Sequence, residues 1–314
     1  MKKFLIKVIF GFLMFILVNA MLVCLVPKDQ NNYYFAWKDK IERLQSLQSP
    51  RLILVGGSSV VYSTDTKMLG DSLGMTAYNM GLHAGIGIKY PVDDLLQYIR
   101  KGDIVVLQIE YPNLVSGGNG DPENLPEFMV INDWHGFSHL TTGQWSSIAR
   151  GLPFVALGNL KRIIKRCIGR SWNHASMGPT YEYGRDGFNY YGDEIMHYKY
   201  PDKTIILPEK KDKRPISEKF VTWLFAVKNK YEQAGAQIIL MPPVCIESQF
   251  KLDYNEEYME KLRKLGCPYI VDPRNMIQPD SLAFDTGYHM NVEGTRRNSL
   301  NMIKVLKPIV CSKN

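Results

Sequence analysis

The chain has 314 residues, of which 45% are hydrophobic, so it can form one large domain with its own core and still carry extensions. Its net charge is +7, with a pI of about 9.0. Part of this excess falls in local clusters, and the sequence carries none of the usual DNA- or RNA-binding motifs. Nucleic acid is therefore excluded as an expected partner.

The N-terminus carries the strongest compositional signal. Lysines within the first seven residues precede Val8 to Val26, an almost unbroken apolar run. A helix of about 20 such residues spans a bilayer, and the lysines before it stay in the cytoplasm. Residues 1–27 are thus expected to form a cytoplasmic tip and signal anchor in the inner (cytoplasmic) membrane, with the rest of the chain extracytoplasmic. A cleaved signal peptide is the alternative, although Val18-Asn-Ala20 is a poor cleavage site.

Residues 28–50 are mostly polar, with apolar residues at helical spacing, which predicts a short stalk helix between membrane and domain. Strands then alternate with helices. The expected strands are 51–56, 76–80, 104–109, 237–241 and 269–271, and the expected helices are 65–73, 90–100, 217–234, 255–265 and 292–307. This alternation is typical of an α/β fold, a three-layer parallel sheet covered on both faces, built here from residues 51–113 and 216–314.

Residues 114–215 interrupt the alternation with Gly and Pro clusters and no sustained period. Helices are expected near 143–150 and 157–168. A strandless segment of this length is usually functional, so we expect a mostly helical insertion that acts as a lid or a substrate-binding subdomain. The basic stretch Lys161–Arg170 has three interpretations: it binds anionic lipid headgroups, it binds an acidic glycan, or it is an ordinary solvent-exposed helix face. Residues 181–200 are rich in aromatic side chains, which either stack on the sugar rings of a substrate or are buried beneath the insertion.

The five cysteines and six histidines form no cluster with the spacing of a metal site, so no metal or other cofactor is expected. Cys245 and Cys267 flank one helical segment. A disulfide between them is chemically allowed outside the cytoplasm, and buried free thiols are the alternative.

Two short stretches carry residues typical of catalysis. The first strand ends in Gly56-Gly-Ser-Ser59, which places a serine at the carboxyl end of a parallel strand, where α/β proteins hold their active sites. Free N–H groups at a nearby helix start suit an oxyanion hole or a phosphate, but the usual glycine motifs for phosphate are absent. Asp285 and His289 stand in the loop before the last helix. If that loop passes over the strand ends, His289 takes a proton from a serine and Asp285 orients the ring.

Together these motifs resemble the SGNH (GDSL-like) hydrolase superfamily. The motifs are Gly56-Gly-Ser-Ser59 after the first strand, Asn79-Met-Gly81 after the second, and Asp285 and His289 before the last helix. The likeness is greater to a membrane-anchored, extracytoplasmic branch, whose members accompany bacterial surface-polysaccharide acylation and teichoic-acid D-alanylation. It covers residues 51–113 and 217–307, leaves the insertion out, and implies the flavodoxin-like fold of that superfamily.

The resemblance also implies roles for individual residues. Ser58 matches the nucleophile, His289 the base and Asp285 its partner. Gly81 matches the glycine whose N–H helps to bind the oxyanion, together with the N–H of Ser58 or Ser59. Ser59 as the nucleophile, or Ser58 as an ordinary helix-capping serine, remain alternatives.

The chain departs from the family pattern in three places. The family's Gly-Asp-Ser is Gly-Gly-Ser here, and the gap between Asp285 and His289 is one residue longer than usual. The third block normally offers an asparagine after the third strand, but here Ile109-Glu-Tyr-Pro-Asn113 occupies that position. An ionised Glu110 cannot donate to an oxyanion. Either Asn113 substitutes, or Glu110 serves the substrate or the structure.

The resemblance and the anchor imply a membrane-anchored serine acyl esterase or O-acyltransferase acting on a cell-surface glycan. The expected partners are a cell-surface polysaccharide or its acyl donor, the lipid bilayer through residues 8–26, and a possible membrane-bound acyltransferase. A non-catalytic scaffold or accessory protein of a polysaccharide acylation or export complex is the alternative, motivated by the departures from the family pattern.

Overall fold

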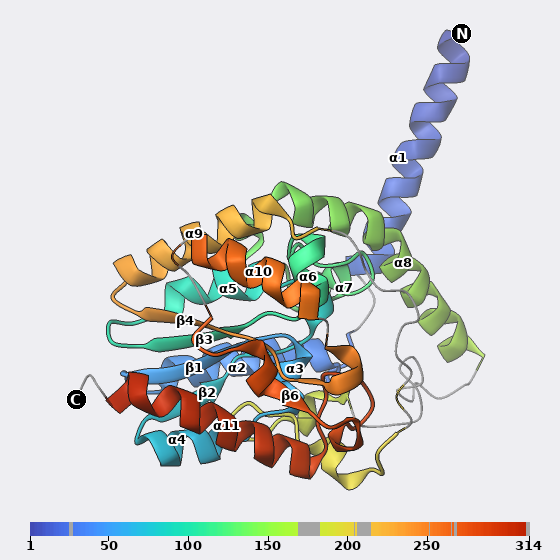
Figure 1. Ribbon diagram of the computed structural model, residues 1–314. Coiled ribbons are helices and arrows are strands. Elements are labelled where there is room, and N and C mark those ends of the chain that lie inside the picture. Colours follow the sequence, from blue (N-terminus) through green and yellow to red (C-terminus); the bar gives the residue numbers. More distant parts are fainter. Residues whose placement is uncertain are drawn as a thin grey trace.

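A four-stranded parallel sheet forms the centre of the domain (Figure 1). The computed structural model describes residues 1–24, 28–168, 183–203, 205, 215–250, 252–264, 266 and 269–311. In spatial order the strands are β2 Thr76–Asn79, β1 Arg51–Gly56, β3 Ile104–Gln108 and β4 Gln237–Met241, and all pairings are parallel. Every residue of β1 and β3 is buried, as expected for a parallel sheet that helices cover on both faces.

Different helices cover the two faces of the sheet, which gives the expected three layers. The domain helices are α2 Ala36–Ser46, α3 Ser58–Tyr62, α4 Thr66–Leu73, α5 Lys89–Leu95, α9 Glu218–Gln233, α10 Leu252–Lys264 and α11 Val292–Cys311. Because successive strand residues point to opposite faces, Leu52 and Leu54 of β1 pack with α4 and α11, whereas Ile53 and Val55 pack with α2, α5 and α9. In Figure 1, α5 and α9 lie on one side of the sheet and α4 and α11 on the other. The predicted α/β class is confirmed.

The strand expected at 269–271 is wrong. The backbone of this segment makes one strand-like hydrogen bond, from the Ile270 N–H to the Leu240 carbonyl of β4 at 3.1 Å. The chain then turns at Asp272 into a 3-10 helix, Pro273–Met276. A short second sheet follows, in which β5 Cys245–Ile246 pairs with β6 Ile277–Gln278.

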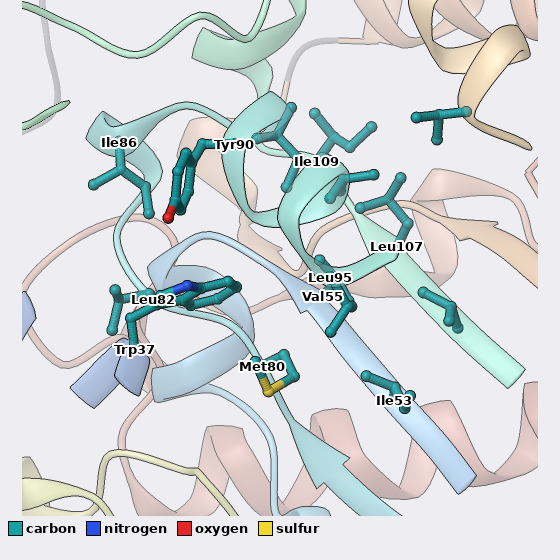
Figure 2. Packing of buried hydrophobic residues seen from close by; sticks show 14 of the residues in the cluster. Trp37, Ile53, Val55, Met80, Leu82, Ile86, Tyr90, Leu95, Leu107 and Ile109 are labelled. Atoms are coloured by element: carbon teal, nitrogen blue, oxygen red, sulfur yellow. The ribbon is translucent and has the colours of Figure 1, made fainter. Parts of the chain in front are cut away.

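The helix expected in the 28–50 segment is present as α2, but it belongs to the domain core and is not a free-standing stalk. Trp37 and Leu44 of this helix are fully buried. The Trp37 indole N–H donates to Asp94 at 3.0 Å, and its ring contacts Tyr90 and Phe128 edge-on. Figure 2 shows Trp37 in one cluster with residues of β1 and β3. Helical spacing indicated an apolar stripe, and the tertiary structure buries that stripe against the sheet.

The N-terminal helix α1, Lys2–Cys24, projects away from the domain (Figure 1). Within the described ranges it is the one helix long and apolar enough to cross a membrane, by length and composition. Nearly all its side chains are exposed, except that Val23 in its last turn is buried. The end of α1 is therefore attached to the domain, and the rest of the helix offers its apolar surface to the surroundings.

The described part of the insertion contains helices and 3-10 turns. Its α-helices are α6 Tyr111–Ser116, α7 Leu125–Ile131 and α8 Thr142–Cys167. The two helices expected at 143–150 and 157–168 are one continuous helix, α8, which runs through Pro153 and begins with a capping box between Thr141 and Gln144. The later part of the insertion lies beside β2 and α3. There the N–H of Asn79 donates to the Tyr191 carbonyl at 2.9 Å, and that of Glu194 to the Val61 carbonyl at 3.2 Å.

Candidate active site

Ser58 is the first residue of α3, directly after β1. The sequence predicted the next helix only after Asp65, and that helix is present as α4, capped by the Asp65 carboxylate. The five-residue helix α3 precedes it. The turn from β1 into α3 requires glycine at both positions before Ser58. A Cβ on Gly56 would lie 2.6 Å from the Gln108 carbonyl oxygen, and a Cβ on Gly57 would lie 2.5 Å from a Glu110 carboxylate oxygen. Ser58 is thus half-buried at the carboxyl end of a central strand.

Asp285 and His289 form the expected pair. His289 Nδ1 lies 2.7 Å from Asp285 Oδ1, and both side chains are nearly buried. The second carboxylate oxygen of Asp285 accepts a hydrogen bond from the Tyr183 hydroxyl of the insertion. Burial alone would raise the pKa of Asp285, but the hydrogen bonds from His289 and Tyr183 hold that pKa below its usual value. Asp285 therefore stays ionised and can orient the imidazole.

The loop that carries this pair is fixed by short polar side chains. Thr286 Oγ1 accepts the N–H groups of Tyr288 and His289, at 3.2 and 3.1 Å. Ser63, which follows α3, donates to the Tyr288 carbonyl at 2.8 Å and accepts the Met290 N–H at 3.1 Å. These bonds hold the loop in one conformation and attach it to the end of α3.

Tyr62 connects the two parts of the site. Its ring stacks on the His289 ring, with centroids 4.4 Å apart and planes 20° apart. Tyr62 lies four residues after Ser58 in α3, so both residues occupy the same face, one turn apart. No hydrogen bond joins Ser58 to His289 among the described residues. Such bonds are often long in substrate-free enzymes and tighten when substrate binds.

The Glu110 side chain contacts the first turn of α3. Its carboxyl is buried, and Oε1 accepts the Ser59 N–H at 2.8 Å. Burial raises the pKa of Glu110, while the hydrogen bond from the Ser59 N–H acts against that rise. Glu110 is therefore a buried carboxyl attached to the first turn of α3.

The donors expected in the oxyanion hole are largely engaged elsewhere. The Gly81 N–H donates to Asn79 Oδ1 at 2.9 Å, and the Ser59 N–H donates to Glu110. Asn113 stabilises the loop over 84–88, because its Nδ2 donates to the Ala84 carbonyl and its Oδ1 accepts the Ile88 N–H, both at 3.2 Å. Of the expected backbone donors in the described chain, the N–H of Ser58 remains, at the open first turn of α3.

Tyr62, Ser63, Tyr183 and Asp193 are site residues that the sequence analysis did not assign. Tyr62 could have been found by helical spacing if α3 had been expected. Tyr183 and Asp193 come from the insertion, where no local pattern marks them. Asp193 Oδ1 accepts the Asn79 amide at 2.9 Å, so the insertion fixes the side chain that orders Gly81.

No group of three His, Cys, Asp or Glu side chains among the described residues is placed to hold a metal ion. Cys245 is a free, buried thiol, and burial raises its pKa to about 12. Cys267, the partner considered for it, lies outside the described residues. The chain matches no model of a known protein family and none of the curated proteins.

Proposed function

We propose that this chain is a membrane-anchored SGNH-type serine acyl esterase or O-acyltransferase that acts on a cell-surface glycan outside the cytoplasmic membrane. The observation that carries this proposal is the Asp285–His289 pair, stacked on Tyr62 one helical turn from Ser58. The strand order β2-β1-β3-β4 supports it, because flavodoxin-like sheets begin with the same order.

The mechanism follows from the positions of these groups. The Ser58 hydroxyl attacks the acyl carbonyl, and His289 Nε2 takes its proton while Asp285 holds Nδ1. The Ser58 N–H, at the start of α3, donates to the oxyanion. Collapse of the tetrahedral intermediate releases the alcohol, which takes the proton from His289. Water or a sugar hydroxyl, deprotonated by His289, then attacks the acyl-serine and regenerates the free Ser58 hydroxyl.

The insertion favours transfer to a sugar over hydrolysis. Tyr183 brings it into contact with Asp285, and its later part covers α3 and the end of β2. Transfer requires that water be kept from the acyl-enzyme, and a covering segment provides that exclusion. An anchor at the membrane would hold the domain where glycan intermediates and their acyl donors are assembled.

The test is fluorophosphonate labelling of the full chain in detergent micelles, followed by peptide mass mapping. A label on Ser58 is expected, absent from Ser58→Ala and strongly reduced in His289→Ala, with Ser59→Ala as the matched control. A label on Ser59 would keep the mechanism and shift the nucleophile by one residue. An unlabelled protein with a cooperative unfolding transition would overturn the enzyme assignment.

A non-catalytic scaffold is the second candidate, and the engaged donors favour it. The Gly81 and Ser59 N–H groups and the Asn113 side chain all have protein partners, and the Glu110 carboxyl contacts the first turn of α3. A scaffold would release no acetate from model esters. Release that depends on both Ser58 and His289 would exclude it.

A further inference from the structure

Helix α8 carries an exposed apolar face. Outside α1, many of the exposed large hydrophobic side chains lie on α8 or at its C-terminal end: Phe154 is 67% exposed, Leu157 47%, Leu160 37%, Ile164 51% and Ile168 61%. These residues recur every three or four positions, so they fall on one side of the helix. Ile148, Gly151, Ala156 and Asn159 are buried on the opposite side. Helix α8 therefore packs one side inside the protein and exposes an apolar side.

The buried side of α8 holds the end of α1. Val23 in the last turn of α1 packs with Ala156 of α8 and Val130 of α7. The Asn159 side-chain amide donates to the Leu22 carbonyl at 2.8 Å. Figure 1 shows α1 leaving the domain beside α8. Because Leu22 and Val23 end the apolar helix, this contact places the middle of α8 at the level where α1 would leave a bilayer.

Two lysines lie among the exposed apolar residues of α8. Lys161 and Lys165 are exposed, and neither makes an ion pair with a described residue. Long lysine side chains can keep their charge at headgroup level while their stems lie along apolar surface. Apolar side chains with interspersed lysines are typical of helices that lie in the plane of an anionic membrane surface.

We propose that α8 lies in the interface of the same bilayer that α1 spans. Phe154, Leu157, Ile164 and Ile168 enter the boundary between headgroups and acyl chains, and Lys161 and Lys165 contact anionic headgroups. The domain would then be attached to the membrane at two points, which fixes its orientation and the height of the catalytic centre. This inference rests on the proposed anchoring by α1, and it does not depend on catalysis.

The experiment is photo-crosslinking of the full chain in vesicles of phosphatidylethanolamine and phosphatidylglycerol that contain a phospholipid with a diazirine in its acyl chain. After illumination, lipid adducts are located by peptide mass mapping. Adducts are expected on α1 and on peptides that cover residues 154–168. Adducts on α1 with none on α8 would overturn the inference and leave the anchoring intact. A chain without adducts on either helix would overturn both, while fluorophosphonate labelling still tests the enzyme separately.

Matched variants sharpen this result. The double variant Leu157→Glu/Ile164→Glu is expected to lower α8 adducts about tenfold, because charge opposes insertion of the apolar face. Phe225→Glu changes an apolar residue of α9 that is 41% exposed and is expected to leave α8 adducts unchanged. Lys161→Gln/Lys165→Gln is expected to lower α8 adducts in anionic vesicles and not in phosphatidylcholine vesicles. Equal labelling of all three variants and the parent would contradict the proposed orientation.

Discussion

The two halves of the candidate site differ in what their hydrogen bonds do. In the acid–base half, Thr286 and Ser63 hold the loop so that Asp285 faces His289 at 2.7 Å. In the oxyanion half, the expected donors instead stabilise the scaffold, as when Gly81 donates to Asn79. The two halves therefore match the resemblance in the sequence to different degrees: the Asp–His pair is formed, and the Ser58 N–H is left as the donor for an oxyanion.

The largest expected effect is that of Ser58→Ala on ester hydrolysis. Removing the nucleophile should lower kcat about 10⁴-fold or more, because no other described group in the acid–base half can form the acyl-enzyme. Initial rates on model acetyl esters measure this loss. Ser59→Ala is the control and should retain most of the rate, since its N–H still donates to Glu110. A Ser58→Ala variant with parental activity would show that Ser58 is not the nucleophile served by the Asp285–His289 pair.

Replacement of Tyr62 tests how the halves are connected. Tyr62→Leu removes the ring that stacks on His289, and the resulting misplacement should lower kcat/KM about 10²-fold. Tyr62→Phe keeps the ring and should stay close to the parent. The decisive readout is kcat/KM measured beside the free energy of unfolding, because loss of positioning lowers the rate of a protein that remains folded. An unchanged kcat/KM in Tyr62→Leu would show that the stacking is structural only.

Glu110 tests the oxyanion half. Glu110→Ala leaves the buried Ser59 N–H without its acceptor, which should lower the free energy of unfolding by about 2 kcal/mol. Glu110→Gln keeps a carbonyl oxygen at that position and should cost less. Chemical denaturation of the full chain in detergent measures both. If Glu110→Gln is as destabilising as Glu110→Ala, then the charge of Glu110, and not its role as a hydrogen-bond acceptor, stabilises the folded protein.

The pH dependence of stability is tested at Glu194, whose N–H joins the insertion to the Val61 carbonyl of α3. Burial raises the pKa of Glu194 to about 8, so the folded protein favours its neutral form. This contribution to stability is present below the usual glutamate pKa and is lost as pH rises from about 4.5 to about 8. Glu194→Gln should flatten this loss and gain stability at pH 8 relative to pH 5. Unfolding curves at the two pH values test it, and an equal slope in both proteins would contradict it.

The elements that the sequence predicted well are those with local determinants. The apolar runs of β1, β3 and β4 were located to within one residue. Helix α4 begins at its Asp65 cap and ends at Gly74, which has a φ of 65° that suits glycine. The Asp285–His289 pair was also predictable, because both residues lie on one short loop. Helix caps, turns and apolar periodicity depend on residues close together in the sequence, so they can be predicted without knowledge of the tertiary structure.

The tertiary structure decided the features that depend on distant partners. It placed Trp37 in the core, brought Tyr183 of the insertion to Asp285, and gave Gly81 and Asn113 partners other than an oxyanion. The segment 269–271 has one strand-like bond to β4, and extended sequence alone cannot show whether a ladder continues. A hydrogen-bond donor takes the partner that folding brings within reach. The sequence therefore determined which groups the site has, and the packing of the insertion and α2 around the sheet decided what each group contacts.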